Sequence, residues 1–125
     1  MAGKFIIDKA KNGFKFNVVA GNGEIIATSE VYESKAGAEN GIESVRKNSV
    51  AEIEDQTLEG YKTIANPKFE IYKDKAGEFR YRLKASNGEI IASGEGYTTK
   101  QSVKNGIESI KNNAPEAQIV DKTVE

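Results

Sequence analysis

An internal repeat constrains the fold of this chain more than any other feature of its sequence. The segment NGEIIA at residues 22–27 recurs at 87–92, and the segment NGIES at residues 40–44 recurs at 105–109. The two copies keep one spacing throughout residues 14–48 and their counterparts, and about half of the paired positions are identical. The sequence therefore predicts one structural module built twice.

Each copy begins with three predicted strands. Apolar and polar side chains alternate along the second of them, as at Phe14, Phe16 and Val18, which is typical of a strand with one buried face. Asn-Gly and Ala-Gly pairs supply the turns, because Asn and Gly accept a positive φ. The predicted strands are residues 4–8, 14–20 and 24–30 in the first copy and 68–72, 79–85 and 89–95 in the second.

A helix and a fourth strand follow in each copy. Ser34 and Thr99 are candidate N-caps, whose side-chain oxygens would accept hydrogen bonds from first-turn amides. Apolar residues spaced four and then three apart predict a narrow apolar stripe on each helix. The stripes are residues 38, 42 and 45 and residues 103, 107 and 110; the helices are expected to end at Asn48 and within 112–115, and the last strands to cover 51–56 and 117–122.

Gly41 and Gly106 lie inside the two predicted helices. Gly in a helix interior costs roughly 1 kcal/mol relative to Ala. One explanation is a close approach of the helix backbone to the sheet or to the other helix. The alternative is that both glycines are merely tolerated.

The two copies are expected to share one core, because a half of roughly 60 residues buries too little surface to be comfortably stable alone. The predicted architecture is α+β: two β-β-β-α-β repeats related by a pseudo-twofold axis, with a mainly antiparallel sheet and two helices on one face. Leu58, Tyr61 and Ile64 indicate that the linker packs against the protein. The expected domain is residues 1–125, with repeats at 4–57 and 68–122 and the linker at 58–67.

The combination of repeated motifs resembles the YegP-like family of small bacterial and archaeal proteins. In the first copy the motif runs through residues 20–24 (AGNGE), 29–35 (SEVYESK) and 41–46 (GIESVR). The resemblance covers nearly the whole chain. It implies that tandem copies build one continuous sheet and exchange their C-terminal strands. The family has no established activity, so the resemblance supplies no catalytic residues and no cofactor.

Composition excludes several classes of function. The chain has no Cys and no His, which removes thiol nucleophiles, zinc-thiolate sites and the commonest general base near neutral pH. Its 18 basic and 19 acidic residues nearly balance, so net charge does not point to nucleic acid or an anionic membrane. No apolar run approaches the roughly 20 residues that span a bilayer. We expect a cytoplasmic protein with no metal or cofactor and no membrane association.

One strand of the second copy carries the most suggestive binding pattern. Arg80, Arg82 and Lys84 alternate with apolar residues, so all three should project from the same sheet face and offer a basic stripe to phosphates. The alternative is a solvated face on which acidic residues of neighbouring strands, such as Glu70, pair with the stripe. The candidate binding residues are Arg80, Arg82, Lys84, Lys15 of the first copy, and Tyr72 as a stacking platform.

A second candidate brings an acid, a phenol and an amine together in each copy. Such groups can transfer protons where burial shifts their pKa values. The simpler interpretation is that the Tyr packs the strand-to-helix corner while the charged groups remain at the surface. The two sets are Glu30, Tyr32 and Lys35, and Glu95, Tyr97 and Lys100.

Three hypotheses therefore remain. The first is a non-enzymatic binding or accessory module that presents a sheet face or edge to a protein partner. The second is weak binding of nucleic acid or another anion through the basic stripe, and the third is a small enzyme. The protein is expected to be a monomer or a weak homo-oligomer, since the outer sheet edges are open to pairing.

Overall fold

The computed structural model describes residues 3–123 of the chain and has an α+β fold. The strands are β1 (Lys4–Ala10), β2 (Gly13–Val19), β3 (Ile25–Thr28), β4 (Glu52–Asp55), β5 (Lys68–Lys73), β6 (Phe79–Lys84), β7 (Ile90–Ser93) and β8 (Gln118–Asp121). The helices are α1 (Lys35–Asn48) and α2 (Lys100–Asn113), and a short 3-10 turn (Ala114–Glu116) follows α2. The predicted order of elements is therefore present in each copy.

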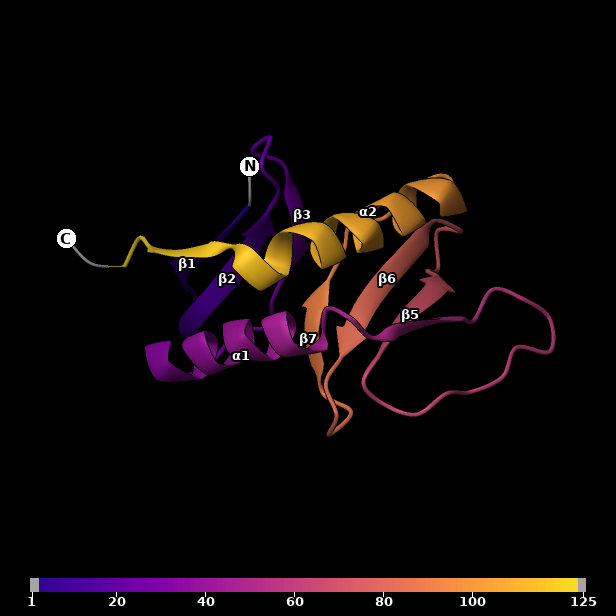
Figure 1. The fold of residues 1–125 in the computed structure, drawn as a ribbon, viewed down its shortest axis with the longest axis horizontal. Coiled ribbons are helices and arrows are strands. Elements are labelled where there is room, and N and C mark those ends of the chain that lie inside the picture. The colour runs from indigo at the N-terminus through magenta and orange to yellow at the C-terminus, as the bar shows by residue number, and fades with distance from the viewer. Residues whose placement is uncertain (1–2, 124–125) are drawn as a thin grey trace.

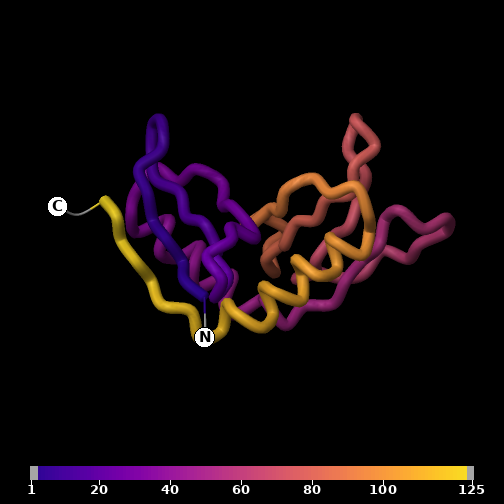
Figure 2. The backbone as a smooth tube through the Cα atoms, turned by 90° about the horizontal axis from the view of Figure 1, so that it is seen from above, coloured from indigo at the N-terminus to yellow at the C-terminus, as the bar shows by residue number. Residues whose placement is uncertain are grey.

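All eight strands belong to one mixed sheet, in the order β4-β5-β6-β7-β3-β2-β1-β8. The two repeats meet where β3 pairs with β7, at Thr28 and Ser93. The last strand of each repeat pairs in parallel with the first strand of the other: β4 with β5, and β8 with β1. The remaining neighbours are antiparallel. Figure 2 shows the C-terminal segment running along the far side of the first repeat.

Both helices cover the same face of the sheet, and each reaches across the repeat boundary (Figure 1). Helix α1 contacts β2 of its own repeat and β6 and β7 of the other, while α2 contacts β6 and β3. The predicted N-caps are confirmed, since Ser34 Oγ accepts from Gly37 N at 3.0 Å and Thr99 Oγ1 accepts from Ser102 N at 3.2 Å.

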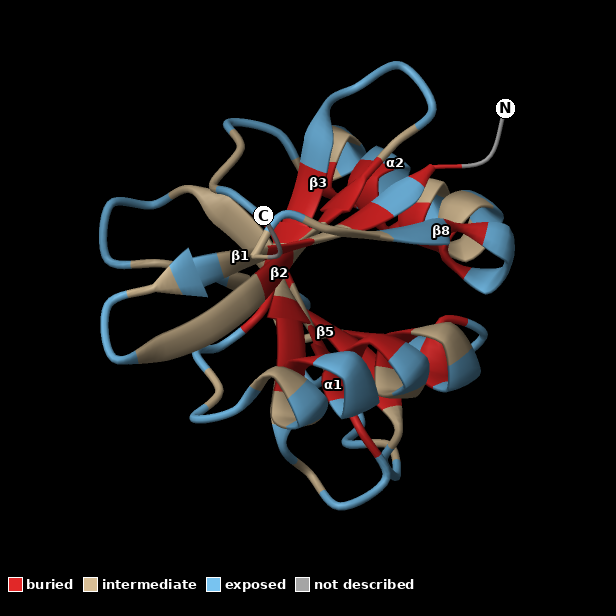
Figure 3. Ribbon diagram, turned by 90° about the vertical axis from the view of Figure 1, so that its left-hand side faces the viewer, coloured by how far each residue is buried: buried red, intermediate tan, exposed pale blue. Residues whose placement is uncertain are grey.

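Apolar residues of both repeats form one buried cluster between the sheet and the helices. Figure 3 shows the buried residues lining the inner surface of the sheet and the facing sides of α1 and α2. Phe16 and Tyr81 occupy equivalent, fully buried positions in the two copies. They differ in one respect, because the Tyr81 hydroxyl donates a hydrogen bond to the carbonyl of Ile26 in the other repeat.

The two helix glycines make room for aromatic side chains. A Cβ at position 41 would lie 2.5 Å from the Tyr32 hydroxyl and 3.0 Å from Phe16 Cε2. A Cβ at position 106 would lie 3.0 Å from Tyr81 Cε1. The helix backbone therefore approaches the sheet closely at both glycines, as one explanation predicted, and the contacts are made by the rings of Phe16 and Tyr81.

Gly94 lies against the ring of Tyr81, and this pairing leads to a prediction. A Cβ at position 94 would overlap the ring carbons Cε1, Cζ and Cδ1 of Tyr81, whereas the first copy combines Phe16 with Ser29. Gly94→Ser should lower the free energy of unfolding by about 1–3 kcal/mol through overpacking. Adding Tyr81→Phe should recover part of the loss, because it recreates the Phe/Ser pair of the first copy. Urea unfolding measures both; equal stability of Gly94→Ser and the parent chain would contradict the packing argument.

Two details differ from the sequence-based expectation. The third strand of each copy is shorter than predicted, ending at Thr28 and Ser93. In the linker, the Leu58 and Tyr61 side chains are exposed by 55% and 44%, so they do not pack as expected. Ile64 is half-buried, and its backbone amide donates to Glu54 at 2.7 Å. Its backbone carbonyl accepts from Lys68 Nζ at 3.2 Å, so two backbone hydrogen bonds tie this part of the linker to the sheet.

Candidate functional site

The predicted basic stripe carries compensated charge. Arg82 Nε lies 2.6 Å from Glu70 Oε1, and Lys84 Nζ lies 3.3 Å from Glu70 Oε2. Arg80 Nε lies 2.6 Å from Asp74 Oδ2. The pairing that the sequence offered as the alternative is therefore present in the structure, and it reduces the positive potential available to phosphates.

The other two stripe candidates lie in different surroundings. The Arg82 guanidinium lies 4.4 Å from the centre of the Tyr72 ring, so this ring already stacks against a cation of the protein. Lys15 is on β2, opposite Asp8 of β1, and strands β3 and β7 separate β2 from β6. The structure therefore brings Tyr72 to the stripe but not Lys15.

A buried ionic cluster that the sequence analysis did not predict lies next to the stripe. Lys68 Nζ lies 2.8 Å from Glu54 Oε2 and 3.4 Å from Glu70 Oε2, and all three residues are buried. Burial by itself would raise the pKa of Glu54, but hydrogen bonds from Gln56, Lys68 and the Ile64 amide outweigh it and lower this pKa to about 2. The cluster exists because β4 pairs with β5 and sets Glu54 opposite Glu70.

These depressed carboxylate pKa values predict acid sensitivity. The pKa of Glu54 falls from an ordinary 4.5 to about 2 on folding, and the pKa values of Asp55 and Glu70 are lowered as well. A carboxylate with a depressed folded-state pKa stabilises the fold above its unfolded pKa and loses that contribution as pH falls toward its folded pKa. The free energy of unfolding should therefore fall between about pH 4.5 and pH 2.

The same stability should be nearly constant between about pH 5 and pH 8, because the chain has no His and no Cys to titrate there. Urea unfolding at pH 7, 5 and 3 separates the two regimes. Equal free energies at pH 5 and pH 3 would contradict the assignment of the low carboxylate pKa values.

The acid–phenol–amine sets are only partly assembled. Lys35 Nζ pairs with Asp121 at 2.9 Å, and Lys100 Nζ pairs with Asp55 at 2.9 Å, so each lysine is held by the last strand of the other repeat. Tyr32 stacks on Phe16 with ring centres 6.2 Å apart. Tyr32 thus packs the strand-to-helix corner, as the simpler interpretation held, and burial raises its pKa away from the range of a general base.

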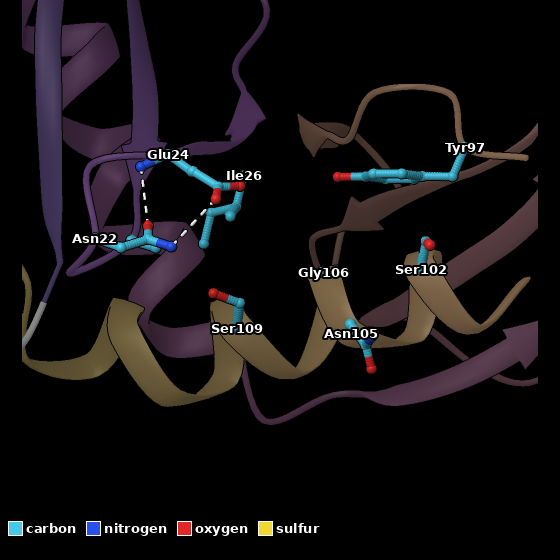
Figure 4. A pocket seen from close by; sticks show the side chains of 9 residues that line it. Asn22, Glu24, Ile26, Tyr97, Ser102, Asn105, Gly106 and Ser109 are labelled. Atoms are coloured by element: carbon cyan, nitrogen blue, oxygen red, sulfur yellow. Dashed lines mark hydrogen bonds between the residues drawn. The ribbon is translucent and has the colours of Figure 1, made fainter. Parts of the chain in front are cut away.

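A hollow of about 250 Å³ lies where the two repeats meet on the helix side of the sheet (Figure 4). We call it the seam hollow. The β2–β3 turn of the first repeat forms one wall, and α2 with Tyr97 of the second repeat forms the other. The lining residues are Ala20, Asn22, Glu24, Ile26, Tyr97, Ser102, Asn105, Gly106 and Ser109.

The β2–β3 turn fixes the position of the one carboxylate in this lining. Glu24 N donates to Asn22 Oδ1 at 3.0 Å, and Asn22 Nδ2 donates to Glu24 Oε1 at 3.3 Å. Glu24 is exposed and forms no ion pair with any residue in the described range 3–123. The hollow therefore holds an ordered negative charge without a counter-charge from the described part of the chain.

Tyr97 faces this carboxylate from the opposite wall. In Figure 4 its hydroxyl points toward Ile26 and Glu24, while Ser102 and Ser109 rise from α2 toward the space between the walls. The pKa of Tyr97 is raised by burial first and then by the negative charges of Glu95 and Glu24. Two carboxylates, one from each repeat, thus set a negative potential around this phenol.

The counterpart of this site at the other side of the repeat boundary is lined differently. There, Tyr32 lies against Gly41 and Phe16. A second hollow, of about 350 Å³, lies between α1 and the β6–β7 turn. Its lining contains Lys47 together with Glu43 and does not include Tyr32. The two copies have therefore diverged in chemistry at related places.

Sequence reasoning missed the seam hollow because its walls come from different repeats. The signal was nevertheless present, since the shared segments 22–27 and 105–109 supply most of the lining. Only the pairing of β3 with β7 brings a turn of one copy beside the helix of the other.

Comparison with known proteins identifies the family. The model of a domain of unknown function, DUF1508, matches residues 10–55 and 74–121, one stretch in each repeat. The chain belongs to the DUF1508 family. Among its relatives is the UPF0339 protein YegP of Escherichia coli (strain K12), 43% identical over 124 residues that span 98% of this chain and 100% of that protein. The resemblance read from the motifs is thereby confirmed.

Relatives of this DUF1508 protein also bear on its architecture. The solution NMR structure of yegP from E. coli, a protein of unknown function, matches with a TM-score of 0.80 at 41% identity, covering 98% of this chain and 94% of that one. The UPF0339 protein Atu5359 of Agrobacterium fabrum is 66% identical over 56 residues, which are 45% of this chain but 90% of that protein. A single repeat therefore accounts for nearly all of that relative.

Proposed function

We propose that this DUF1508 protein is a non-enzymatic binding module and that the seam hollow is its recognition site for a protein partner. The observation that carries this proposal is that residues shared by both copies gather at the hollow. Glu24, Glu95 and Tyr97 have identical counterparts in the other repeat, and all three lie in or beside the hollow.

Most other polar residues that the two copies share have a structural role. Lys35 and Lys100 pair with the exchanged strands. Asn48 and Asn113 donate to the carbonyls of Ser44 and Ser109 near the helix ends, both at close to 2.9 Å. Exposed Glu24 and Glu95 form no ion pair among residues 3–123. Recognition accounts for shared residues of this kind better than packing does.

A binding role agrees better than catalysis with the chemistry of the hollow. Its lining has one carboxylate, a phenol whose pKa is raised, and neutral hydroxyl and amide groups. General acid–base catalysis requires a group that titrates near the working pH, and neither the lining nor the composition supplies a side chain whose usual pKa lies there. The proposed protein carries no cofactor and works in the cytoplasm.

Affinity capture from nuclease-treated native lysate tests this function when matched variants run in parallel. A partner should be retained by the parent chain and by Glu89→Gln, and lost with Glu24→Gln combined with Tyr97→Ala. Glu89 is the right control because it is the exposed counterpart of Glu24 in the other copy. Equal retention by all three proteins would remove the seam hollow as the recognition site.

A second candidate surface is the pair of sheet edges. Ile53 on β4 and Ile119 on β8 occupy equivalent edge positions and are exposed by 41% and 40%. Edge strands offer unpaired backbone groups to an extended peptide. In the same capture experiment, loss of the partner with Ile53→Lys and Ile119→Lys, but not with the hollow variants, would favour the edges.

We also propose that each repeat depends on the strand it receives from the other. β4 and β8 each add one parallel strand to the opposite repeat, and Lys100–Asp55 and Lys35–Asp121 tie these strands to the helices. The exchange therefore couples the two halves through backbone pairing and ion pairs together.

A further inference from the structure

We propose that the seam hollow binds an aliphatic primary ammonium group, carried either by a free alkylamine or by a lysine side chain of the partner. This inference rests on the function proposed above and names the chemistry of its ligand. It follows from the charge of the hollow, the groups that line it and its difference from the first repeat.

The charge of the hollow favours a cation. Glu24 lies in the lining, and Glu95 precedes the Tyr97 that closes the far wall. The lining contains no Lys or Arg. Lys100, at the start of α2, is held by Asp55 at 2.9 Å, so it is not free to neutralise the site.

The lining also fits the shape of an alkylammonium group. An ammonium has three N–H donors and no acceptor, and the Glu24 carboxylate, the Tyr97 hydroxyl and the Ser102 hydroxyl are all acceptors on the walls of the hollow. A charge-assisted bond to the carboxylate is the strongest of these. The methylene stem of the ligand would lie against apolar atoms of Ala20, Ile26 and the Tyr97 ring.

The first repeat supplies an internal comparison. Glu30 and Glu89 surround Tyr32 as Glu95 and Glu24 surround Tyr97, since both carboxylates raise the pKa of Tyr32. Tyr32, however, packs on Phe16 and Gly41, and the counterpart hollow is lined by Lys47 and includes neither Tyr32 nor Glu89. Binding that needs a carboxylate and a phenol in one hollow should therefore discriminate between the two copies.

NMR titration of the full chain tests the proposal with defined probes. 1,4-Diaminobutane should shift backbone amides around Asn22, Tyr97 and Ser109, and 1,4-butanediol at the same concentration should not. Glu24→Gln should weaken diaminobutane binding by about tenfold or more, because a hydrogen bond to a charged group contributes about 1.5–3 kcal/mol. Glu89→Gln should leave the affinity unchanged within about twofold, as expected of a site confined to one copy.

Blocked lysine distinguishes the two sources of the ammonium group. Saturable binding of N-acetyl-lysine-N-methylamide, lost on acetylation of its side-chain amine, supports a lysine of the partner. Binding of diaminobutane without binding of blocked lysine supports a free alkylamine.

The proposal is overturned if butanediol binds as well as diaminobutane, or if Glu24→Gln and Glu89→Gln weaken binding equally, which indicates diffuse attraction to a negative surface. Absence of any binding by both amines also overturns it. If neither amine binds but capture of the partner still requires Glu24 and Tyr97, the ammonium proposal fails and the proposed recognition site stands. If capture does not require these two residues either, the recognition site fails as well.

Discussion

Residues 1–57 expressed alone will not form a folded monomer; they will be unfolded or will assemble as a homodimer. In the described chain, β4 pairs with β5, β1 with β8 and β3 with β7. The isolated first repeat therefore leaves β4 without a partner and loses a neighbour at each end of its β3-β2-β1 sheet. Core residues of the two repeats also contact each other in one cluster. A half-length chain would therefore expose much of its apolar surface.

A homodimer satisfies the same pairings, with a second copy in place of the second repeat. The Agrobacterium relative, nearly all of which is one repeat, is expected to use this arrangement. Sedimentation equilibrium and far-UV circular dichroism of the fragment decide between the outcomes. Adding residues 58–125 should restore a one-to-one complex with the ellipticity of the parent chain. A well-folded monomeric fragment would contradict the dependence of each repeat on the other.

Lys68→Met should lower the free energy of unfolding by about 3–5 kcal/mol, which is the cost of removing one partner from a buried ion pair. Among residues 3–123, Lys68 Nζ is the only cation within 4 Å of the Glu54 carboxylate, whereas Glu70 keeps Arg82 and Lys84. The substitution therefore leaves Glu54 charged, buried and opposite another carboxylate.

Two further variants make this prediction specific. Lys4→Met changes the equivalent position of the first repeat, where the lysine is exposed, and should alter stability by less than about 0.5 kcal/mol. Glu54→Val added to Lys68→Met removes the orphaned charge and should recover most of the loss, since Val120 occupies the equivalent position on β8. Denaturant unfolding measures all three. A loss below about 1 kcal/mol for Lys68→Met would show that Glu54 does not depend on this lysine.

Local chemistry was sufficient to predict the elements. N-cap side chains at Ser34 and Thr99, period-two strands and Asn-Gly turns depend on a few neighbouring residues, so they can be read without knowing the fold. Strand ends were less accurate, because β3 and β7 stop where their pairing with β2 and β6 stops, and pairing is not a local property. Neither helix in residues 3–123 is long and apolar enough to cross a membrane.

The surroundings of the candidate site residues, unlike the helices and strands, depend on the tertiary structure. Alternation correctly set Arg80, Arg82 and Lys84 apart from the core residues between them, and it raised Glu70 as a possible partner. It did not reveal that Lys68 and Glu54 are buried, because the exchange of β4 decides that burial. Nor did it place Lys35 and Lys100 beside aspartates of the other repeat.

The sequence by itself determined that one module occurs twice and which residues each copy turns toward its interior, because repetition and periodicity are properties of the chain. The tertiary structure alone decided which residues of one copy lie beside which residues of the other. Glu24 and Tyr97 are more than 70 residues apart, and only the joining of β3 to β7 makes them opposite walls of one hollow. The physical reason is that such contacts depend on strand pairing between repeats, which no local pattern of side chains encodes.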